Sequence, residues 1–414
     1  MRFRLLVLLF VGLVGIAYAW AAYRYHLFPF EADPSTSASL TENEMERLRA
    51  LGYLPGYDEV GEEPVGVVQR AAEGVQPGLN LYLSAHAPEA FLMTVEGETI
   101  HSWGHTFEEA CPDKDPEDVD NFFHRARVLP GGDLLAIFDY EALVRIDRES
   151  QLVWAQCRRY HHDFTFAGDG TIYAVSRGPR RVVHDGRPTR ILDDRLEILS
   201  PQGEMLKGVS LYDAFAGSEY ASMVTFSDDV PKKRDGDIFH VNAVKWLDGR
   251  HEQRFPAARR GNVLISIRHL STIAIVDMER GGVVWARAGD WRFQHESVLL
   301  DSGNILLFDN YGMGEHSRVI ELDPGTGETV WQYTGDGREN FFSLTLGSNE
   351  RLANGNTLIN LSARGRAIEV TPDHEVVWEF RSPHSVQDGE LIATLQYLTR
   401  LRPDFPVDWL AAPD

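Results

Sequence analysis

The stretch from Gly132 to Trp154 reads GDLLAIFDYEALVRIDRESQLVW. Three runs in which apolar residues predominate, 134–138, 143–147 and 153–154, are separated by short polar turns, a pattern typical of consecutive antiparallel strands. The same order of a glycine, two strands and a third strand with a tryptophan returns three more times. These recurrences run from Gly261 to Trp285, from Gly303 to Trp331 and from Gly355 to Trp378.

Two less regular units bring the number of repeats to six. One ends at Trp103, and one around 171–173 carries a long insertion before 197–199. The units recur at roughly 40 to 55 residues, the range of four-stranded propeller blades, and helical periodicity is nearly absent. We therefore predict an all-β fold, a six-bladed β-propeller over residues 77–402. We expect a closing strand at 394–398 beside the first blade, and tryptophans on the outermost strands that pack between blades.

The N-terminal segment has the features of a membrane element. Arg2 and Arg4 precede an uncharged apolar run from Leu5 to Ala22, which is followed by an aromatic and basic edge. This run is long enough to span a bilayer, so residues 1–26 are predicted to be an uncleaved transmembrane helix, a signal anchor. A cleaved signal peptide is the alternative, because 17–19 reads Ala-Tyr-Ala. In both cases the remainder is exported, and we expect the propeller on the periplasmic, extracytoplasmic side of the inner membrane.

The remaining parts of the chain are predicted to flank the propeller. Residues 27–76 read as a stalk with a short amphipathic helix, whose capping box is formed by Thr41 and Glu44. Residues 403–414 are predicted to be a C-terminal tail.

Charge and cysteine content limit the classes of partner. The chain of 414 residues has 62 Asp and Glu against 40 Lys and Arg, a formal net charge of -22. Such a surface argues against nucleic acid and against anionic lipid as general partners. Cys111 and Cys157 are the two cysteines, and either a disulfide between neighbouring repeats or two thiols fits their spacing. No cysteine spacing indicates a zinc site, and no metal or cofactor is expected.

Histidines occupy one register position of the repeat. A histidine opens the first strand of four units, and a polar residue ends the second strand. In a propeller these two positions are neighbours at one mouth of the central channel. The resulting pairs are His124 and Asp139, His162 and Arg177, His240 and Arg268, and His295 and Asn310.

A ring of His and Arg with few ligating carboxylates suits an oxyanion such as sulfate or phosphate. Arg offers a planar fork of donors, and neutral imidazole can act as a nucleophile toward a sulfuryl or phosphoryl centre. A metal site based on histidine is the competing interpretation. A lone histidine at such a position is more often a structural residue, and the repetition in four units is what favours a site.

Five short motifs, taken in order, resemble the successive signatures of bacterial arylsulfotransferases. They are YHHDF at 160–164, FHVN at 239–242, SIRH at 266–269, QH at 294–295 and FDN at 308–310. The resemblance covers about residues 79–400. It implies a six-bladed periplasmic propeller that moves a sulfuryl group from an aryl sulfate donor to a phenolic acceptor without a nucleotide sulfate.

The resemblance also implies roles for individual residues. His295 matches the nucleophile that becomes a sulfohistidine, Arg268 and His240 match groups that hold the sulfuryl oxygens, and Asn242 matches a nearby polar contact. His162 matches the first histidine of the site, where the repeat register selects it over its neighbour His161.

The predicted site therefore contains two groups of residues. His295, His240, Arg268 and His162 are the catalytic candidates, and Asn242, Asn310, Arg177 and His124 are the candidates for substrate binding. Glu296 directly follows the predicted nucleophile, and its charge would oppose an anionic donor if it faced the site.

Two other functions compete with the sulfotransferase. One is a non-catalytic, membrane-tethered β-propeller that binds a protein or a glycan and uses the histidines for packing. The other is a quinone-cofactor dehydrogenase propeller, which is disfavoured because neither a cofactor-stacking motif nor a carboxylate cluster for calcium is recognisable. The sequence leaves the oligomeric state open, with a homo-oligomer among the alternatives.

Overall fold

The computed structural model describes residues 55–115, 119–184, 186–226, 236–314, 316–337 and 341–410. The predicted transmembrane helix at 1–26 and the helix that starts at Thr41 lie outside these ranges. Among the described residues, no helix is long and apolar enough to cross a membrane.

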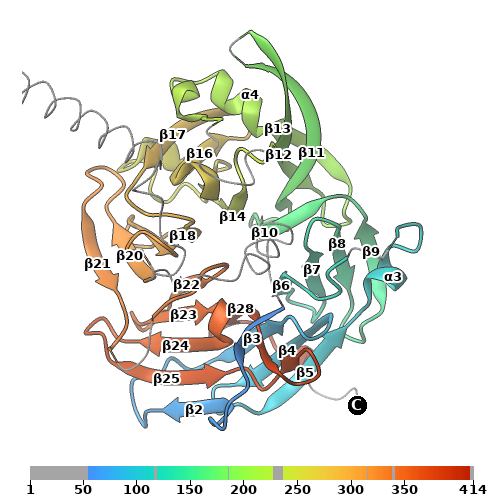
Figure 1. Ribbon diagram of the computed structural model, residues 1–414, viewed down its shortest axis with the longest axis vertical. Coiled ribbons are helices and arrows are strands. Elements are labelled where there is room, and N and C mark those ends of the chain that lie inside the picture. The colour runs from blue at the N-terminus through green and yellow to red at the C-terminus, as the bar shows by residue number, and fades with distance from the viewer. Residues whose placement is uncertain are drawn as a thin grey trace, which may run out of the picture. The chain divides into compact units, whose positions relative to one another are not determined.

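Antiparallel β-sheets make up most of the described chain, which confirms the all-β class. Figure 1 shows the sheets arranged around a common centre, in a propeller-like way, with β6, β10, β14, β18, β22 and β28 innermost.

The first three sheets follow one another along the chain, and each has four strands. The first contains β28 (Leu395–Arg400), β3 (Leu79–Ser84), β4 (Glu89–Thr94) and β5 (Thr99–Gly104). The second contains β6 (Arg125–Val128), β7 (Leu134–Phe138), β8 (Ala142–Ile146) and β9 (Leu152–Gln156). The third contains β10 (Tyr160–Phe166), β11 (Ile172–His184), β12 (Arg187–Leu199) and β13 (Met205–Ser210).

Three further sheets of four or five strands continue the order. The fourth contains β14 (Val241–Trp246), β15 (Val263–Ile267), β16 (Thr272–Asp277) and β17 (Gly282–Ala288). The fifth contains β18 (His295–Leu299), β19 (Ile305–Asp309), β20 (Arg318–Leu322) and β21 (Thr329–Tyr333). The sixth contains β22 (Ser348–Arg351), β23 (Thr357–Leu361), β24 (Arg366–Val370), β25 (Val376–Arg381) and β2 (Gly66–Arg70).

Helices in the described part are short. They are α3 (Phe107–Ala110) and α4 (Leu211–Ala216), and the 3-10 turns η1 (Ala221–Met223), η3 (Pro256–Ala258), η4 (Arg268–Leu270), η5 (Ser362–Arg364) and η6 (Asp408–Leu410).

The second strands of the repeats form the core. Every residue of β7, β15, β19 and β23 is buried, whereas the outer strand β9 has no buried residue. A strand that packs against other sheets on both faces needs a continuous apolar run, which is the pattern of 134–138 in the sequence. The strand predicted at 134–138 matches β7 at both ends.

The C-terminal strand β28 pairs with β3, with Leu398 opposite Tyr82. The strand predicted at 394–398 beside the first blade is therefore confirmed, with bounds of 395–400, and it brings a C-terminal strand into the sheet of β3, β4 and β5.

Part of the predicted stalk belongs to the sheets. β1 (Gly56–Glu59) pairs with β27 (Leu391–Ala393), which also pairs with β26 (Ser385–Val386), and β2 pairs with β25. The structure therefore differs from the prediction of a separate stalk for these residues, because their backbone groups find partners at open sheet edges. In the predicted tail, the Trp409 ring lies 5.7 Å from that of Trp103.

Tryptophans on the outer strands connect neighbouring sheets. The indole nitrogen of Trp103 donates to the carbonyl of Gly132 at 2.9 Å, and that of Trp154 donates to the carbonyl of Pro201 at 3.2 Å. Trp378 makes the same kind of bond with Val95, but it is not on an outermost strand as predicted. The reason is that β2, from the N-terminal segment, adds a strand outside β25.

Cys111 and Cys157 form a disulfide, which decides between the two alternatives left by their spacing. Cys111 follows α3 and Cys157 follows β9, so the bond links the segment that leads into the second sheet with the segment that leaves it.

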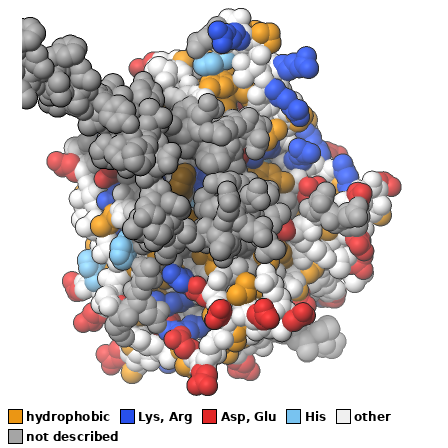
Figure 2. Space-filling view, in the orientation of Figure 1, with side chains coloured by type: hydrophobic (Ala, Val, Ile, Leu, Met, Phe, Trp, Pro, Cys, Tyr) orange, Lys and Arg blue, Asp and Glu red, His pale blue; other side chains and the backbone are white. Residues whose placement is uncertain are grey.

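Acidic side chains are spread over the face shown in Figure 2, and basic side chains gather near the β11–β12 hairpin at its upper edge. Arg181, Arg187 and Arg190 on this hairpin are exposed. The long insertion predicted before 197–199 is this hairpin, whose two strands have 13 residues each.

Candidate active site

The strand register brings the predicted residue pairs together. The His124 amide donates to the carbonyl of Ile137 at 2.9 Å, two residues before Asp139. The Arg268 amide donates to the carbonyl of His240 at 3.1 Å, and His295 lies opposite Phe308. The start of each innermost strand therefore lies beside the end of the second strand of the same sheet.

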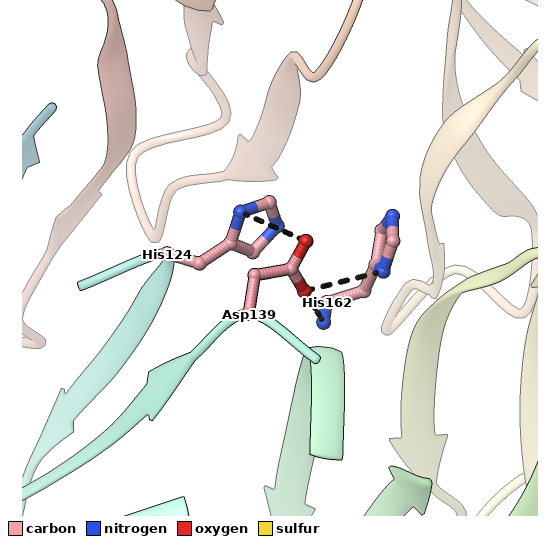
Figure 3. A group of neighbouring side chains, drawn as sticks. All are labelled: His124, Asp139 and His162. Atoms are coloured by element: carbon pink, nitrogen blue, oxygen red, sulfur yellow. Dashed lines mark hydrogen bonds and ion pairs between the residues drawn. The ribbon is translucent and has the colours of Figure 1, made fainter. Parts of the chain in front are cut away.

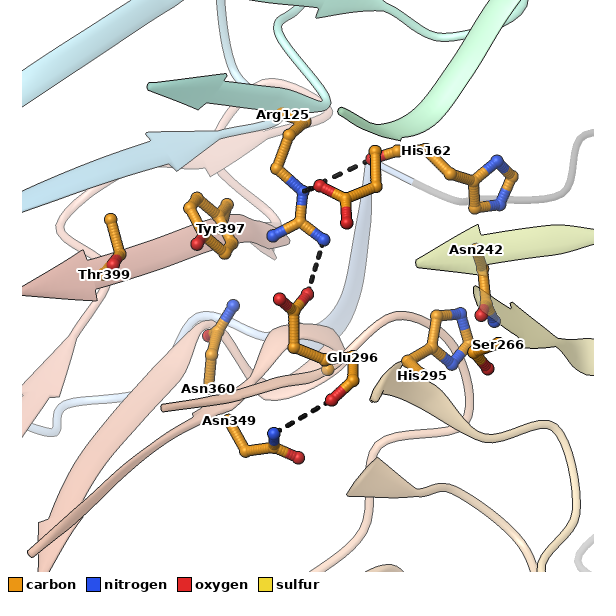
Figure 4. A network of polar contacts seen from close by, with 12 residues as sticks. Arg125, His162, Asn242, Ser266, His295, Glu296, Asn349, Asn360, Tyr397 and Thr399 are labelled. Carbon is orange, nitrogen blue, oxygen red and sulfur yellow. Dashed lines mark hydrogen bonds and ion pairs between the residues drawn. The ribbon is translucent and has the colours of Figure 1, made fainter. Parts of the chain in front are cut away.

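Histidine rings from different sheets are in contact with one another. The His162 ring centroid lies 5.1 Å from that of His124 and 4.8 Å from that of His240, and His240 lies 4.6 Å from His269. All four side chains are buried. Figure 4 shows His162, Asn242 and His295 on the same side of a central ion pair.

His295 is held as a neutral imidazole with a defined tautomer. Its Nδ1 lies 2.7 Å from Oδ1 of Asn310, whose Nδ2 donates to the carbonyls of Ser343 and Leu346 at 2.8 and 2.7 Å. Since both amide protons of Asn310 are used, its Oδ1 is the acceptor, and Nδ1 of His295 carries the proton. Nε2 of His295 then has a lone pair, and it is buried with no hydrogen-bond partner in the part of the chain that the structure describes.

Burial, and then the nearby Arg268 cation, lowers the pKa of His295 to about 3. Arg268 follows β15, its Nη1 lies 2.9 Å from Nε2 of His269, and its guanidinium carbon lies 4.3 Å above the Phe293 ring. Nδ1 of His269 lies 2.7 Å from the Asp237 carbonyl, so His269 donates there and accepts from Arg268. Arg268 is therefore a positioned cation beside His295.

His240 forms a dyad with a carboxylate. Its Nδ1 lies 2.7 Å from Oδ2 of Asp237. His240 and His162 both have left-handed backbone conformations, with φ of 56° and 59°. Such conformations are strained for residues other than glycine and concentrate at functional sites.

His162 and His124 share Asp139, as Figure 3 shows. Oδ1 of Asp139 accepts the His162 amide at 3.0 Å, and its Oδ2 lies 3.9 Å from Nδ1 of His124. Burial, followed by the neighbouring histidines, holds the pKa of His162 well below its usual range. Nδ1 of His161 lies 2.8 Å from Nδ1 of His162, and the His161 ring stacks on Tyr140 with centroids 5.0 Å apart. The structure therefore places His162, the residue selected by the register, at the centre of the histidine cluster.

Two predicted substrate contacts have other partners. Arg177 donates from Nε to Asp194 at 2.7 Å, and its Nη2 lies 3.0 Å from Oδ1 of Asp237. The Asn310 amide is used by His295 and by two carbonyls. Both residues therefore position catalytic candidates. The sequence led us to expect that they contact a substrate directly, and their geometry does not support this. Asn242 differs, because its Nδ2 donates to the Gln294 carbonyl at 2.7 Å while its Oδ1 has no partner among the described residues.

A buried ionic cluster lies next to the histidines and was not predicted. Nη2 of Arg125 donates to Glu296 at 2.6 Å, as Figure 4 shows. Lys245 lies 2.6 Å from both Glu296 and Asp163. The charge of Glu296 is thereby compensated by two cations, which removes the expected conflict with an anionic donor. A signal was present in the sequence, since a charged residue directly follows His124, His162 and His295.

Two groups of described residues could hold a metal ion. They are His124 with Asp139 and His162, and Asp237 with His240 and His269, with ligand atoms within 4.8 Å of one another in each group. In the second group both ring nitrogens of His269 already have partners, so a metal that used Nε2 would displace Arg268.

A family model described as arylsulfotransferase (ASST) matches residues 125–383. No curated protein matches the chain. Among solved structures, a Bacteroides caccae protein of unknown function is 12% identical with a TM-score of 0.52, and the match covers 78% of this chain and 98% of that one. At this identity the similarity concerns the fold alone.

Two further solved structures are more distant. The WD40 β-propeller domain of Doa1 is 12% identical with a TM-score of 0.39 and covers 79% of this chain and 97% of that one. A streptogramin B lyase is 10% identical with a TM-score of 0.44, and the match covers 83% of this chain and 97% of that one.

Proposed function

Because the chain belongs to the arylsulfotransferase family, we propose that it moves a sulfuryl group from an aryl sulfate donor to a phenolic acceptor, without a nucleotide sulfate. The transfer proceeds in two steps through a sulfohistidine at His295.

The observation that carries this proposal is the state of the His295 imidazole. Its Nδ1 proton is bound by Asn310, its Nε2 lone pair has no partner among the described residues, and its pKa of about 3 keeps it neutral. A neutral, oriented imidazole with an available lone pair is a nucleophile at neutral pH.

In the first step, Nε2 of His295 attacks the sulfur atom, and the bond between sulfur and the aryl oxygen breaks. The aryl oxygen leaves with the bonding electrons and takes a proton from His240, and the sulfuryl group stays on Nε2. Arg268 stabilises the negative charge of the sulfuryl oxygens, and its proximity is supported by its effect on the pKa of His295.

His240 is the candidate for the general acid and base. Asp237 lies 2.7 Å from its Nδ1, an arrangement that stabilises the protonated imidazole. In the second step the phenolic oxygen attacks the sulfur, the bond between Nε2 and sulfur breaks, and His240 takes the phenolic proton. Oδ1 of Asn242, which is buried without a described partner, is a candidate acceptor for the phenol hydroxyl.

We also propose that the six sheets of four or five strands are the blades of one six-bladed propeller. The pairing of β28 with β3 supports this proposal, because the C-terminal strand, which follows the sixth sheet along the chain, completes the first sheet as a blade closure requires.

The proposed location is the extracytoplasmic side of the inner membrane, with residues 1–26 as the anchor. The apolar run from Leu5 to Ala22 supports it. The disulfide between Cys111 and Cys157 supports an oxidising compartment.

The proposal is tested with 4-nitrophenyl sulfate as donor and phenol as acceptor. Release of more than one equivalent of 4-nitrophenolate is expected to depend on phenol, and all release is expected to disappear in His295→Ala. Mass spectrometry of the protein incubated with donor alone is expected to find one added sulfuryl group on the peptide that contains His295.

The matched control is His316→Ala, because His316 is exposed. Release that is unchanged in His295→Ala would remove this residue from the mechanism. Absence of turnover in the wild-type protein with a range of aryl sulfates would favour the non-catalytic propeller that binds a protein or a glycan.

A further inference from the structure

A cavity of about 700 Å³ lies at the end of the innermost strands that is opposite the histidine cluster. Its walls are formed by residues near the ends of these strands, such as Arg127, Phe166, Lys245, Leu299, Arg351 and Arg400. The histidine cluster lies at the beginnings of the same strands. Of the described residues, no histidine lines this cavity.

The ionic cluster separates the cavity from the histidines. Lys245 and Glu296 line the cavity, and both belong to the cluster that also contains Arg125 and Asp163. Figure 4 shows Arg125 and Glu296 of this cluster. A molecule in this cavity would therefore meet charged groups at its inner end rather than His295.

Positive charge is in excess at this inner end. Arg127 lies 3.3 Å from Asp163, so three cations, Arg125, Arg127 and Lys245, face the two carboxylates of Asp163 and Glu296. Burial by itself would raise the pKa values of the Asp163 and Glu296 carboxyl groups. The effect of the neighbouring cations is larger, so both pKa values are lowered and both carboxylates are ionised at neutral pH. These five groups carry one net positive charge. Glu350 also lines the cavity and interacts with Arg127, and burial raises the pKa of its carboxyl group, which opposes its ionised form.

Two buried polar atoms on the cavity wall have no hydrogen-bond partner within the described ranges. They are Oδ1 of Asn349 and Nη2 of Arg400, and each side chain belongs to a residue that is at most 3% exposed. Buried polar atoms in native proteins are nearly always paired, with protein, water or ligand. The wall also carries apolar side chains, among them Phe166, Leu299 and Leu352.

From this combination we propose that the cavity binds an amphipathic organic anion, distinct from the sulfuryl donor and acceptor. Its anionic group would contact Arg127 and Lys245, and its apolar body would lie against Phe166 and Leu299. Cavities that bind small molecules combine an apolar wall with placed polar groups. This cavity has both, and it is more strongly charged than most, with the cations Arg127, Lys245, Arg351, Arg400 and Arg402 on its wall.

The experiment is isothermal titration calorimetry with 2-naphthoate, a carboxylate that carries no sulfuryl group. The wild-type protein is expected to bind one equivalent. Arg127→Gln is expected to weaken binding about tenfold, the effect of losing one charge-assisted hydrogen bond. Thr165→Trp, which places a large ring in the cavity, is expected to abolish binding, and Thr165→Val is its matched control.

Two further variants locate the bound naphthoate. His295→Ala is expected to bind it as the wild type does, and Arg148→Gln, at an exposed turn, is expected to do the same. Loss of binding in His295→Ala would place the ligand in the histidine site and overturn the proposal. Absence of binding to the wild type, or binding to folded Thr165→Trp that equals the wild type, would also overturn it. None of these outcomes depends on sulfuryl transfer, so this proposal and the proposed function can fail separately.

Discussion

Nδ1 of His295 lies 2.7 Å from Oδ1 of Asn310, and the Asn310 amide nitrogen donates to two backbone carbonyls. The two residues come from neighbouring strands of one sheet, β18 and the end of β19. This relationship determines which nitrogen of His295 keeps its proton, and therefore which nitrogen can attack sulfur.

Replacing Asn310 by Ala is expected to lower kcat for sulfuryl transfer by about 10- to 100-fold, because His295 loses the group that selects its tautomer, a loss of about 1.4 to 2.7 kcal/mol. The KM for the donor should change little, since Asn310 does not contact it. Steady-state kinetics checks this, with the midpoint of urea unfolding as a control for stability. A changed KM with an unchanged kcat would assign Asn310 to substrate binding.

Replacing Asp237 by Asn is expected to lower kcat most for donors with poor leaving groups. The Asp237 carboxylate lies 2.7 Å from Nδ1 of His240, and its charge stabilises the proton that His240 would give to the leaving oxygen. A donor such as 4-methylphenyl sulfate needs that proton more than 4-nitrophenyl sulfate does. Comparing the two donors in the variant and in the wild type checks this, and an equal loss for both would contradict a role in proton transfer.

Stability is expected to fall as the pH is lowered from about 6.5 toward 5. Burial lowers the pKa values of His295 and His269 to about 3, and the pKa values of His124 and His162 are also lowered. Below the ordinary value of 6.5 the unfolded chain binds protons at these residues and the native protein does not, so protonation favours unfolding. Each of these histidines lowers the free energy of unfolding by up to about 1.4 kcal/mol per pH unit, until the pH reaches the pKa that the histidine has in the native protein.

Urea unfolding between pH 6.5 and 5 measures this dependence before most carboxylates titrate. His295→Gln is expected to make the dependence shallower, whereas His316→Gln, at an exposed position, should leave it unchanged. A stability that does not vary over this range would show that the buried histidines are charged in the native protein.

Replacing Glu296 by Gln is expected to lower the free energy of unfolding by about 3 to 5 kcal/mol. This is the usual range when one charged partner of a buried ion pair is removed and the other stays buried. Glu296 lies 2.6 Å from Arg125 and from Lys245, and all three side chains are largely buried. The exposed pair of Arg148 and Glu149 offers a control, since Glu149→Gln should change stability by less than about 1 kcal/mol. Urea denaturation measures both, and equal effects would show that burial of the cluster does not matter.

Much of the sheet structure was predictable because its signals are local. The apolar runs 134–138 and 263–267 are bounded by turn residues, and the structure has strands β7 and β15 over these residues. The pairing of β2 outside β25 was not predictable, because nothing near Gly66 in the sequence indicates which sheet edge has room for another strand.

In the candidate site, too, some features were predictable from the sequence and others were not. Repeat spacing was enough to place the histidines at one end of the innermost strands, since residues at equal register positions meet at the same mouth of a propeller. The contacts of Arg177 with Asp194 and Asp237 could not be read from spacing, because they depend on which carboxylates of other strands lie within hydrogen-bond reach.

The sequence alone therefore determined the strand repeat, the all-β class and the membership of His162, His240 and His295 in one group, because periodicity and register are properties of the linear chain. Only the tertiary structure decided that Asn310 and Arg177 position other residues, that Glu296 is neutralised by Arg125 and Lys245, and that a cavity lies at the other end of the innermost strands. The physical reason is that hydrogen bonds, charge compensation and enclosed volume arise between side chains distant in the sequence, and they act over a few ångströms in space.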